Sequence, residues 1–341
     1  MRSVVVALVL VTACGDGEPD LSDATSLECP RPGTLPFRLE SSGFQRPENE
    51  AMVVEDIRAK DDASDTIGKP GGACAAIELA EDQMPGPGAI EYRGLIARTT
   101  PDGGLFTHAL PGEFVSLRYY DAGSQMWQQI GRTQTDGEGR YAIPDSGFVA
   151  ANGEPLYAML EADGSCTAHY NQLLPAGSNV IVTDIDGTLT TSDDELFMQI
   201  SDGSYVPAMM AGADTLLQTW ASKGYPIVYV TARPHLFRSE TRQWLDDLGF
   251  PPGPVITAVV IGDTATYKSL WLDRMFDTFG WVPVAAYGNA DTDIIAYENS
   301  GIPKDRTFIV GPLAGMSGTV AIENNDFTQH ISTFVAAQPD N

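Results

Sequence analysis

The chain has 341 residues, of which 43% are hydrophobic and 19% charged, enough for two ordinary domains with hydrophobic cores. Its formal net charge of −26 argues against nucleic acid as a partner. No block rich in Lys and Arg is present to hold an anionic membrane surface. A phosphate-bearing partner would therefore have to be held by local positive charge.

The first residues are typical of a secretion signal. An apolar run at residues 3–11 is too short to span a bilayer, and the small residue Ala13 precedes Cys14. This arrangement resembles a bacterial lipobox, whose cysteine becomes lipidated and N-terminal after cleavage. We expect residues 1–13 to be a lipoprotein signal peptide and the mature protein to be exported and membrane-anchored through Cys14, at the periplasmic face or the cell surface. The alternative is an ordinary signal peptide with an incidental cysteine.

Three further cysteines, Cys29, Cys74 and Cys166, leave room for at most one intramolecular disulfide. The sequence does not say which two would pair. Their wide spacing and the lack of His/Cys pairs at zinc-ligand spacing argue against a zinc site.

Two N-terminal regions differ in pattern. Residues 14–85 are rich in Asp, Glu, Ser, Pro and Gly, which indicates a tether and N-terminal extension with no assignable fold. Residues 86–175 contain short alternating runs separated by turn residues and predict a small β-sandwich, with strands near residues 90–95, 114–119, 126–130 and 156–160. Residues 135–141 are expected to form a tight hairpin turn, because they lack most of the ligands of a calcium loop.

Residues 176–337 show a third pattern, in which continuous apolar strands alternate with amphipathic helices. Strands are predicted near residues 180–182, 227–230, 284–287 and 308–310, and helices near 208–223, 237–248 and 267–278. This pattern is typical of an α/β fold with a parallel sheet covered by helices on both faces. Ligands of such sheets bind at the carboxyl ends of the strands.

Side chains that could bind a metal ion or a phosphate lie at or after the ends of these strands. Asp184 and Asp186 leave the first strand one residue apart, and two carboxylates aimed into one cleft would need a divalent cation. Thr231 ends the second strand just before a helix, where a hydroxyl and free N–H groups suit a phosphate oxygen, although Thr is also a common helix cap. Lys268 begins a later helix and, taken alone, has the features of a surface lysine.

Residues 287–293 end the next strand with Asn289, Asp291 and Asp293, which offer oxygen ligands for Mg²⁺. The ordered set of DIDGT at residues 184–188, Thr231, Lys268 and GNADTD at residues 288–293 resembles the motifs of the haloacid dehalogenase-like (HAD) phosphohydrolase superfamily. Over residues 178–315 the motifs look equally like the catalytic domain of lipins, which are phosphatidate phosphatases, and the LNS2 (Lipin/Ned1/Smp2) domain of membrane-associated phosphatidylinositol transfer proteins. Those families also carry an immunoglobulin-like module where the sandwich is expected here.

The resemblance implies a Rossmann-like parallel sheet, a magnesium cofactor and a role for each matching residue. Asp184 would be the nucleophile and Asp186 the general acid and base, while Thr231 and Lys268 would hold phosphate oxygens. It further implies that the substrate phosphate contacts residues of the first two motifs, which are Thr188, Ala232 and Arg233. Mg²⁺ would be bound by Asp184, the carbonyl of Asp186 and Asn289, with Asp293 behind.

Short intervals between the motifs leave no room for a large cap domain over the site, so a bulky or membrane-borne phosphate ester is favoured. Arg233, His235, Arg238 and Arg242 form a basic cluster that is either a receptor for a lipid phosphate headgroup or a solvated helix face. The favoured function is a phosphatase acting on phosphatidate or a related lipid phosphate. The alternatives are a non-catalytic phosphatidate sensor and a phosphatase for a soluble phosphomonoester.

Overall fold

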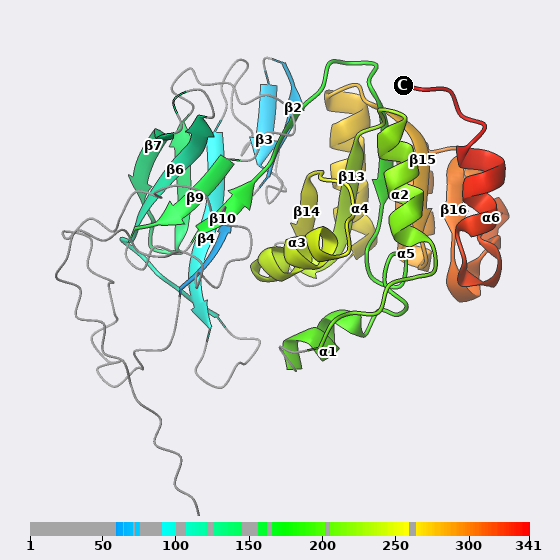
Figure 1. Cartoon of the computed structure of the whole chain (residues 1–341), viewed down its shortest axis with the longest axis horizontal. Helices are drawn as coiled ribbons and strands as arrows, with labels where there is room; N and C mark the ends of the chain where they lie inside the picture. Colours follow the sequence, from blue (N-terminus) through cyan, green and yellow to red (C-terminus); the bar gives the residue numbers. More distant parts are fainter. Residues whose placement is uncertain are drawn as a thin grey trace, which may run out of the picture.

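A computed structural model describes the chain from residue 59 onward, with gaps. The described ranges are 59–63, 65–70, 72–75, 91–99, 107–121, 124, 126–144, 156–161, 166–201, 205–258 and 264–341. An all-β region comes first in the chain, and a layered α/β region follows it (Figure 1). Cys14, Cys29 and the expected signal peptide lie outside these ranges.

Two antiparallel four-stranded sheets form most of the β region. In the first, β4 pairs with β1 on one side and with β5 and β8 on the other; in the second the order is β10-β9-β6-β7. Buried side chains from both sheets, including Tyr92, Val115, Ile143 and Leu160, share one hydrophobic cluster. The four strands expected here are present, while the immunoglobulin-like topology stays a prediction. The bounds are β1 Ala59–Ala63, β4 Glu91–Thr99, β5 Thr107–Ala109, β6 Phe114–Asp121, β7 Met126–Gln134, β8 Arg140–Pro144, β9 Leu156–Leu160 and β10 Cys166–His169.

The turn at residues 135–141 is tight, but it does not close a hairpin. Asp136 organises it: one carboxylate oxygen accepts the N–H groups of Glu138 at 2.8 Å and Arg140 at 2.9 Å. The strands on either side belong to different sheets, because β7 pairs with β6 and β8 pairs with β4. The hairpin prediction is therefore wrong, because a two-sheet arrangement needs corners that pass the chain from one sheet to the other.

A small third sheet includes two strands from residues 14–85, the segment for which the sequence predicts no assignable fold. Strands β2 Thr66–Lys69 and β3 Gly72–Ala75 pair antiparallel, and β11 Asn171–Leu173 runs parallel to β2. Ile67 and Cys74 are fully buried in the same hydrophobic cluster as residues of the α/β region. These strands are too short and too rich in small and polar residues to stand out in the sequence, and pairing with distant strands stabilises them.

The α/β region is built on a six-stranded parallel sheet in the order β14-β13-β12-β15-β16-β17. This confirms the parallel sheet expected from the apolar strands. The strand that precedes Asp184, β12, lies in the middle, with β13 and β15 as its direct neighbours. The bounds are β12 Asn179–Thr183, β13 Ile227–Pro234, β14 Val255–Ala258, β15 Val282–Gly288, β16 Thr307–Ile309 and β17 Val320–Ala321.

Helices cover both faces of this sheet, and each face has its own hydrophobic cluster. On one face α2 Ala213–Ser222, α3 Arg238–Asp247 and the C-terminal α6 Thr328–His330 with its π-helical continuation pack on alternate strand residues. On the other face lie α4 Thr264–Asp273, α5 Asp291–Asn299, and the strands β2 and β3. The three expected helices are present near their predicted positions, and the third continues as a π-helical turn at Arg274–Thr278.

The segment between β12 and β13 contains α1 Glu195–Ser201 and α2, and no further domain in the described residues. In Figure 1, α1 lies apart from the sheet, below it in that view. No helix in the described ranges has the length and apolar character needed to cross a membrane.

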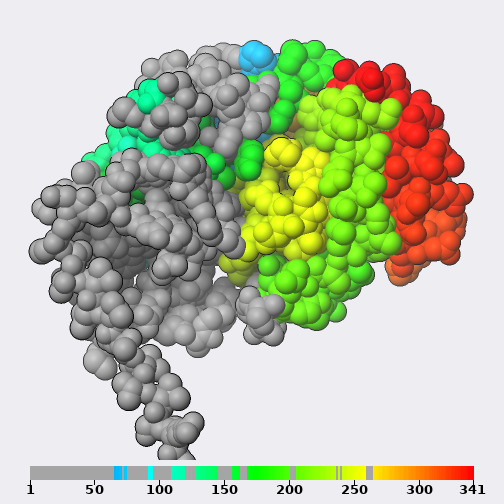
Figure 2. All heavy atoms as spheres, in the orientation of Figure 1, coloured from blue at the N-terminus to red at the C-terminus, as the bar shows by residue number. Residues whose placement is uncertain are grey.

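The C-terminal residues close the far edge of the α/β region. In the space-filling view their surface, in red, is continuous with the yellow-green surface around α2 (Figure 2). The N–H of Asn341 donates to the carbonyl of Lys223 at 2.7 Å, and the Lys223 ammonium donates to the carbonyl of Gln338 at 2.8 Å. The tail is thus held against the end of α2.

Candidate functional site

The candidate site lies where the three central strands end. The core of β12 is fully buried, and the chain leaves it at Asp184, whose N–H donates to the carbonyl of Tyr287 on β15 at 3.0 Å. Because β13 and β15 run parallel to β12 on either side, Thr231 and Asn289 end up at the same edge of the sheet as Asp184. The structure therefore brings the separate motifs together.

Lys268 lies buried between two carboxylates. Its ammonium is 2.6 Å from Oδ1 of Asp184 and 2.6 Å from Oδ1 of Asp293. The reading of this residue as a solvated surface lysine is therefore wrong, since only 3% of its side chain is exposed. Helix α4 carries it, and burial of Trp271 and Leu272 on the same helix fixes the helix against the sheet.

The protonation of Asp184 follows from this crowding. Burial raises its pKa to about 7 even though the ammonium of Lys268 opposes the shift, and the charges of Asp293 and Asp186 add to the rise. Two carboxylates share one ammonium, so the cluster has an excess of negative charge. The carboxylates raise the pKa of Lys268, which keeps it charged.

Asn289 is held against the loop that follows Asp184. The hydroxyl of Thr188 lies 3.4 Å from Oδ2 of Asp184 and 3.3 Å from Oδ1 of Asn289. Gly187 has φ of +68°, and a Cβ there would lie 2.0 Å from Nδ2 of Asn289. Only glycine allows this approach, because it tolerates positive φ and has no side chain to collide.

Asp293 orders the other side of the same loop. Its Oδ2 accepts the N–H groups of Asn289 at 3.0 Å and Ala290 at 3.1 Å, at the start of α5. A carboxylate placed here offsets the partial positive charge of the helix N-terminus. Asp293 thus fixes Asn289 through the backbone while its second oxygen accepts from Lys268.

This donor set fits a magnesium ion. An oxygen of Asp184 and the amide oxygen of Asn289 both lie within 3.4 Å of the Thr188 hydroxyl, and Gly187 allows the Asn289 side chain to approach the loop closely. Hard oxygen ligands with few carboxylates are what Mg²⁺ takes, because it keeps several waters. No cluster of three or more His, Cys, Asp or Glu suited to a metal occurs in the described ranges.

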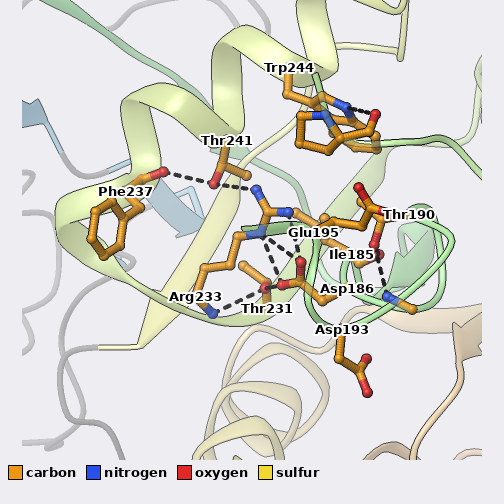
Figure 3. A network of polar contacts seen from close by, with 12 residues as sticks. Ile185, Asp186, Thr190, Asp193, Glu195, Thr231, Arg233, Phe237, Thr241 and Trp244 are labelled. Carbon is orange, nitrogen blue, oxygen red and sulfur yellow. Dashed lines mark hydrogen bonds and ion pairs between the residues drawn. The ribbon is translucent and has the colours of Figure 1, made fainter. Parts of the chain in front are cut away.

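Asp186 is clamped by Arg233 (Figure 3). Nε of the guanidinium donates to both carboxylate oxygens, at 2.9 and 3.1 Å, and Nη2 donates to Oδ1 at 2.7 Å. Thr231 lies beside them, with its hydroxyl 3.4 Å from Oδ2 of Asp186. The remaining nitrogen of Arg233, Nη1, donates to Oγ1 of Thr241 at 3.1 Å.

Glu195 anchors the start of α1 next to this ion pair. Its carboxylate accepts from the hydroxyls of Thr191 and Tyr205, both at 2.7 Å, and from the N–H of Ala208 at 2.8 Å. Burial alone would raise the pKa of Glu195, but these hydrogen bonds and the nearby charge of Arg233 hold it below its usual value. Glu195 therefore ties the segment before α2 to the edge of the site.

The side chains of the expected basic cluster are not exposed at the protein surface. His235, Arg238 and Arg242 are all buried, and the two arginines pair with Asp65 of the β region. Both readings of the cluster, as a headgroup receptor and as a solvated helix face, are therefore wrong. The sequence showed the positive charges but not Asp65, which lies far upstream in a segment with no recognisable pattern.

Of the phosphate-binding residues implied by resemblance, Ala232 is exposed at the end of β13, whereas the side chain of Arg233 is fully buried. The guanidinium is committed to Asp186 and Thr241. Sequence reasoning missed Thr241 and Glu195. A hydroxyl one helical turn into α3 and an acid just past an acidic loop are common features, and neither carries a distinctive signal.

Most of the α/β region matches a known protein family. Residues 181–311 match the family model described as the LNS2 domain of PITM 1-3. The chain therefore contains an LNS2-like domain, which spans the strands and loops that carry every candidate site residue.

Curated relatives extend this similarity over more of the chain. It is 27% identical over 228 residues to the protein retinal degeneration B of Drosophila melanogaster, covering 65% of this chain and 18% of that one. It is 28% identical over 207 residues to membrane-associated phosphatidylinositol transfer protein 3 of Mus musculus, covering 60% and 20%. The chain thus matches about a fifth of these relatives' length.

Among solved structures, an apo phosphoserine phosphatase is 14% identical with a TM-score of 0.32 and covers 46% of this chain and 98% of its own.

Proposed function

We propose that the chain is a magnesium-dependent phosphomonoester hydrolase that works through an aspartyl-phosphate. The observation that carries this proposal is the buried Asp184–Lys268–Asp293 cluster beside Asn289, at the carboxyl end of the central strand. A buried nucleophile next to a fixed ammonium is suited to accepting a phosphoryl group, whose charge the ammonium stabilises. The motif resemblance to HAD phosphohydrolases and the match to the LNS2 domain support it.

The reaction would proceed in two steps. An oxygen of Asp184 attacks phosphorus, the bond from phosphorus to the ester oxygen breaks, and Asp186 gives a proton to the leaving alkoxide. Asp186 then takes a proton from a water, whose oxygen attacks the same phosphorus, and the bond to Asp184 breaks to release inorganic phosphate. Lys268 and the Thr231 hydroxyl hold the non-reacting phosphate oxygens.

Asp184, the carbonyl of Asp186 and Asn289 would hold Mg²⁺, with Asp293 behind. The bound ion supplies positive charge that offsets the charge on the phosphoryl group. Lys268 already pairs with both carboxylates, so it fixes the carboxylate of Asp184 for attack.

A lipid phosphate such as phosphatidate is the substrate class we propose. The relatives are named as membrane-associated phosphatidylinositol transfer proteins, and the segment between β12 and β13 adds only α1 and α2 in the described ranges. Lipidation at Cys14 and export as a bacterial lipoprotein would place the site near a membrane.

The test is phosphate release by the purified full chain from phosphatidate in mixed micelles and from a panel of soluble phosphomonoesters, with Mg²⁺ and with EDTA. We expect Mg²⁺-dependent release, fastest with phosphatidate, and a loss of at least about a thousandfold in Asp184→Asn. Asp277→Asn is the matched control, because that acid is exposed and lies outside the site. Undiminished turnover by Asp184→Asn would refute the mechanism, and fastest turnover of a soluble ester would refute the lipid assignment.

A non-catalytic lipid sensor is the second candidate. The observation that favours it is that both oxygens of Asp186 are taken up by Arg233, so the acid would have to exchange partners during a reaction. Sedimentation with phosphatidate vesicles, together with no hydrolysis of any ester in the panel, would establish this function in place of the first.

A further inference from the structure

The guanidinium of Arg233 is fixed from two sides. Two of its nitrogens bind the carboxylate of Asp186, and the third donates to the hydroxyl of Thr241 on α3 (Figure 3). The guanidinium is planar, so the hydrogen bond from Nη1 to Thr241 fixes the plane of the whole group. Nε and Nη2 must then donate to the Asp186 carboxylate in that plane. The direction of Asp186 therefore depends on where Thr241 lies.

Thr241 is itself oriented by its helix. Its hydroxyl donates to the carbonyl of Phe237 at 2.7 Å, one turn earlier, so its lone pair is available to Arg233. This arrangement makes Thr241 an acceptor in a fixed position. Any shift of α3 moves that acceptor with it.

Helix α3 is held by a residue of the β region. Arg238 and Arg242, one turn apart on α3, both donate to Asp65, with Nη2 of Arg242 2.9 Å from Oδ2. Thr241 lies three residues after Arg238 and next to Arg242, so all three positions share one side of the helix. Nη1 of Arg242 also donates to the carbonyl of Gly253 at 2.8 Å.

Asp65 has no exposed surface and is bound on every side that the structure describes. Its oxygens also accept the N–H of Tyr170 at 3.0 Å and the N–H of Val255 on β14 at 2.7 Å. Burial alone would raise the pKa of Asp65, but Arg238 and Arg242 hold it below its usual value. A buried carboxylate with two charged partners and two backbone donors is a rigid anchor.

We propose that Asp65 is a positioning residue for the reaction, acting on Asp186 through helix α3, Thr241 and Arg233. The β region then helps to orient Asp186, although none of its described residues touches the reacting carboxylates. This inference rests on the proposed function for its catalytic meaning. The contacts that carry it can be tested without catalysis.

The first test follows the Arg233 side chain directly in the full chain. The Nε–H resonance of ¹⁵N-labelled protein is assigned through its loss in Arg233→Lys, and its exchange with solvent is measured. We expect Thr241→Val and Asp65→Asn to speed this exchange about tenfold, because Arg233 loses one of its fixed sides. Thr219→Val is the control, since Thr219 makes the same bond to a carbonyl one turn earlier on α2 but binds no arginine.

The second test separates positioning from folding. In Thr241→Val we expect kcat to fall by roughly tenfold to a hundredfold with KM unchanged, because Lys268 and Thr231 still hold the phosphate. Thr241→Ser, which keeps the acceptor, should restore kcat. If Asp65→Asn does not fold, Asp65→Glu replaces it. Glutamate keeps the negative charge, and its additional methylene displaces α3.

Unchanged Nε–H exchange in both Thr241→Val and a folded Asp65 variant would overturn the proposal. An equal loss of kcat in Thr241→Ser and Thr241→Val would also overturn it. If wild-type protein hydrolyses no ester but the exchange still rises in the variants, the proposed function fails while the control of Asp186 by Asp65 stands.

Discussion

Lys268 is a buried lysine at the centre of a negatively charged cluster, and lysine is rarely found in such a position. Lys268 offsets two carboxylates, one directly after strand β12 and one in the first turn of helix α5, so its removal leaves Asp184 and Asp293 buried with uncompensated charge. Breaking a buried ion pair from one side is far more costly than its net contribution suggests, because the partner stays desolvated. The residue therefore affects stability as well as chemistry.

We predict that Lys268→Met lowers the free energy of unfolding by about 3–5 kcal/mol at pH 7.5, measured by urea denaturation in EDTA. Added Mg²⁺ should recover part of this loss, since the ion replaces the missing positive charge. Lys304→Met is the control: its pair with Glu298 is largely exposed, so its effect should stay within about 0.5 kcal/mol. Equal losses in the two variants would contradict the buried-cluster argument.

Gly187 has a positive φ and lies directly against the side chain of Asn289. Replacing it with alanine would place a methyl group against Asn289 and strain a backbone with φ of +68°, so both stability and Mg²⁺ affinity should fall. Gly177→Ala is the matched control, with φ of +87° and nothing within 4 Å of the added methyl. Calorimetric titration with Mg²⁺ should show affinity at least about tenfold weaker in Gly187→Ala and unchanged in Gly177→Ala.

How much of the site could be predicted from the sequence depends on how each residue is placed. Asp184 and Asn289 directly follow apolar strands and Thr231 lies near the end of one, so a parallel sheet brings all three to one edge. The partners of buried charges are different. Asp65 lies more than 170 residues from the arginines that it binds, and no local pattern identifies it.

At the scale of elements, four of the six strands of the parallel sheet, β12, β13, β15 and β16, were predictable because each contains a continuous apolar run. The short strands β1, β2 and β3 were not predictable, since they contain Asp, Lys and Gly. They are stabilised by pairing: β1 pairs with β4, β2 with β11, and β3 with β2. Strand β14, which lies after a Pro- and Gly-rich loop, was also not predicted, although all four of its residues are buried like those of the central strands.

Helix α6 and the segment after it present a pH-sensitive contact to the sheet. His330 packs against Phe308 and Phe334, and its Nε2 lies 3.0 Å from the hydroxyl of Tyr287. Burial lowers the pKa of His330 to about 4. Between pH 6.5 and 4 the unfolded chain takes up a proton at this residue and the folded chain does not, so stability falls as the pH is lowered through this window.

We predict that His330→Gln removes this part of the acid sensitivity. The free energy of unfolding should fall between pH 7 and 4.5 by about 1–2 kcal/mol more in the wild type than in the variant, less than the full shift implies because the ring is partly solvated. The difference between the two curves cancels the titration of carboxylates common to both. Parallel curves would show that His330 is not the group responsible.

At the scale of the whole molecule, the β and α/β regions are joined by more than a linker. Strands β2 and β3 contribute Ile67 and Cys74 to the cluster on one face of the parallel sheet, while Asp65 binds α3 on the other. The Lys69 ammonium also donates to the carbonyl of Thr278 at 2.7 Å. Joined in this way, the regions should unfold together.

The last prediction concerns this coupling. The full chain should unfold in a single thermal transition, with near-UV and far-UV circular dichroism curves that coincide. A chain beginning at residue 176 keeps the complete motif set but loses Asp65 and the other β-region residues that cover Arg238 and Arg242. It also uncovers an apolar face of the parallel sheet. We expect its melting temperature to fall by at least about 10 °C, or the chain to aggregate, because apolar surface of the parallel sheet becomes exposed and both arginines lose their ion pairs. Asp65→Asn in the full chain separates the contribution of the charge from that of the apolar contacts, since it keeps Ile67 and Cys74 in place. Two separate transitions in the full chain, with the second unaffected by the truncation, would show that the α/β region folds independently and that Asp65 is dispensable for it.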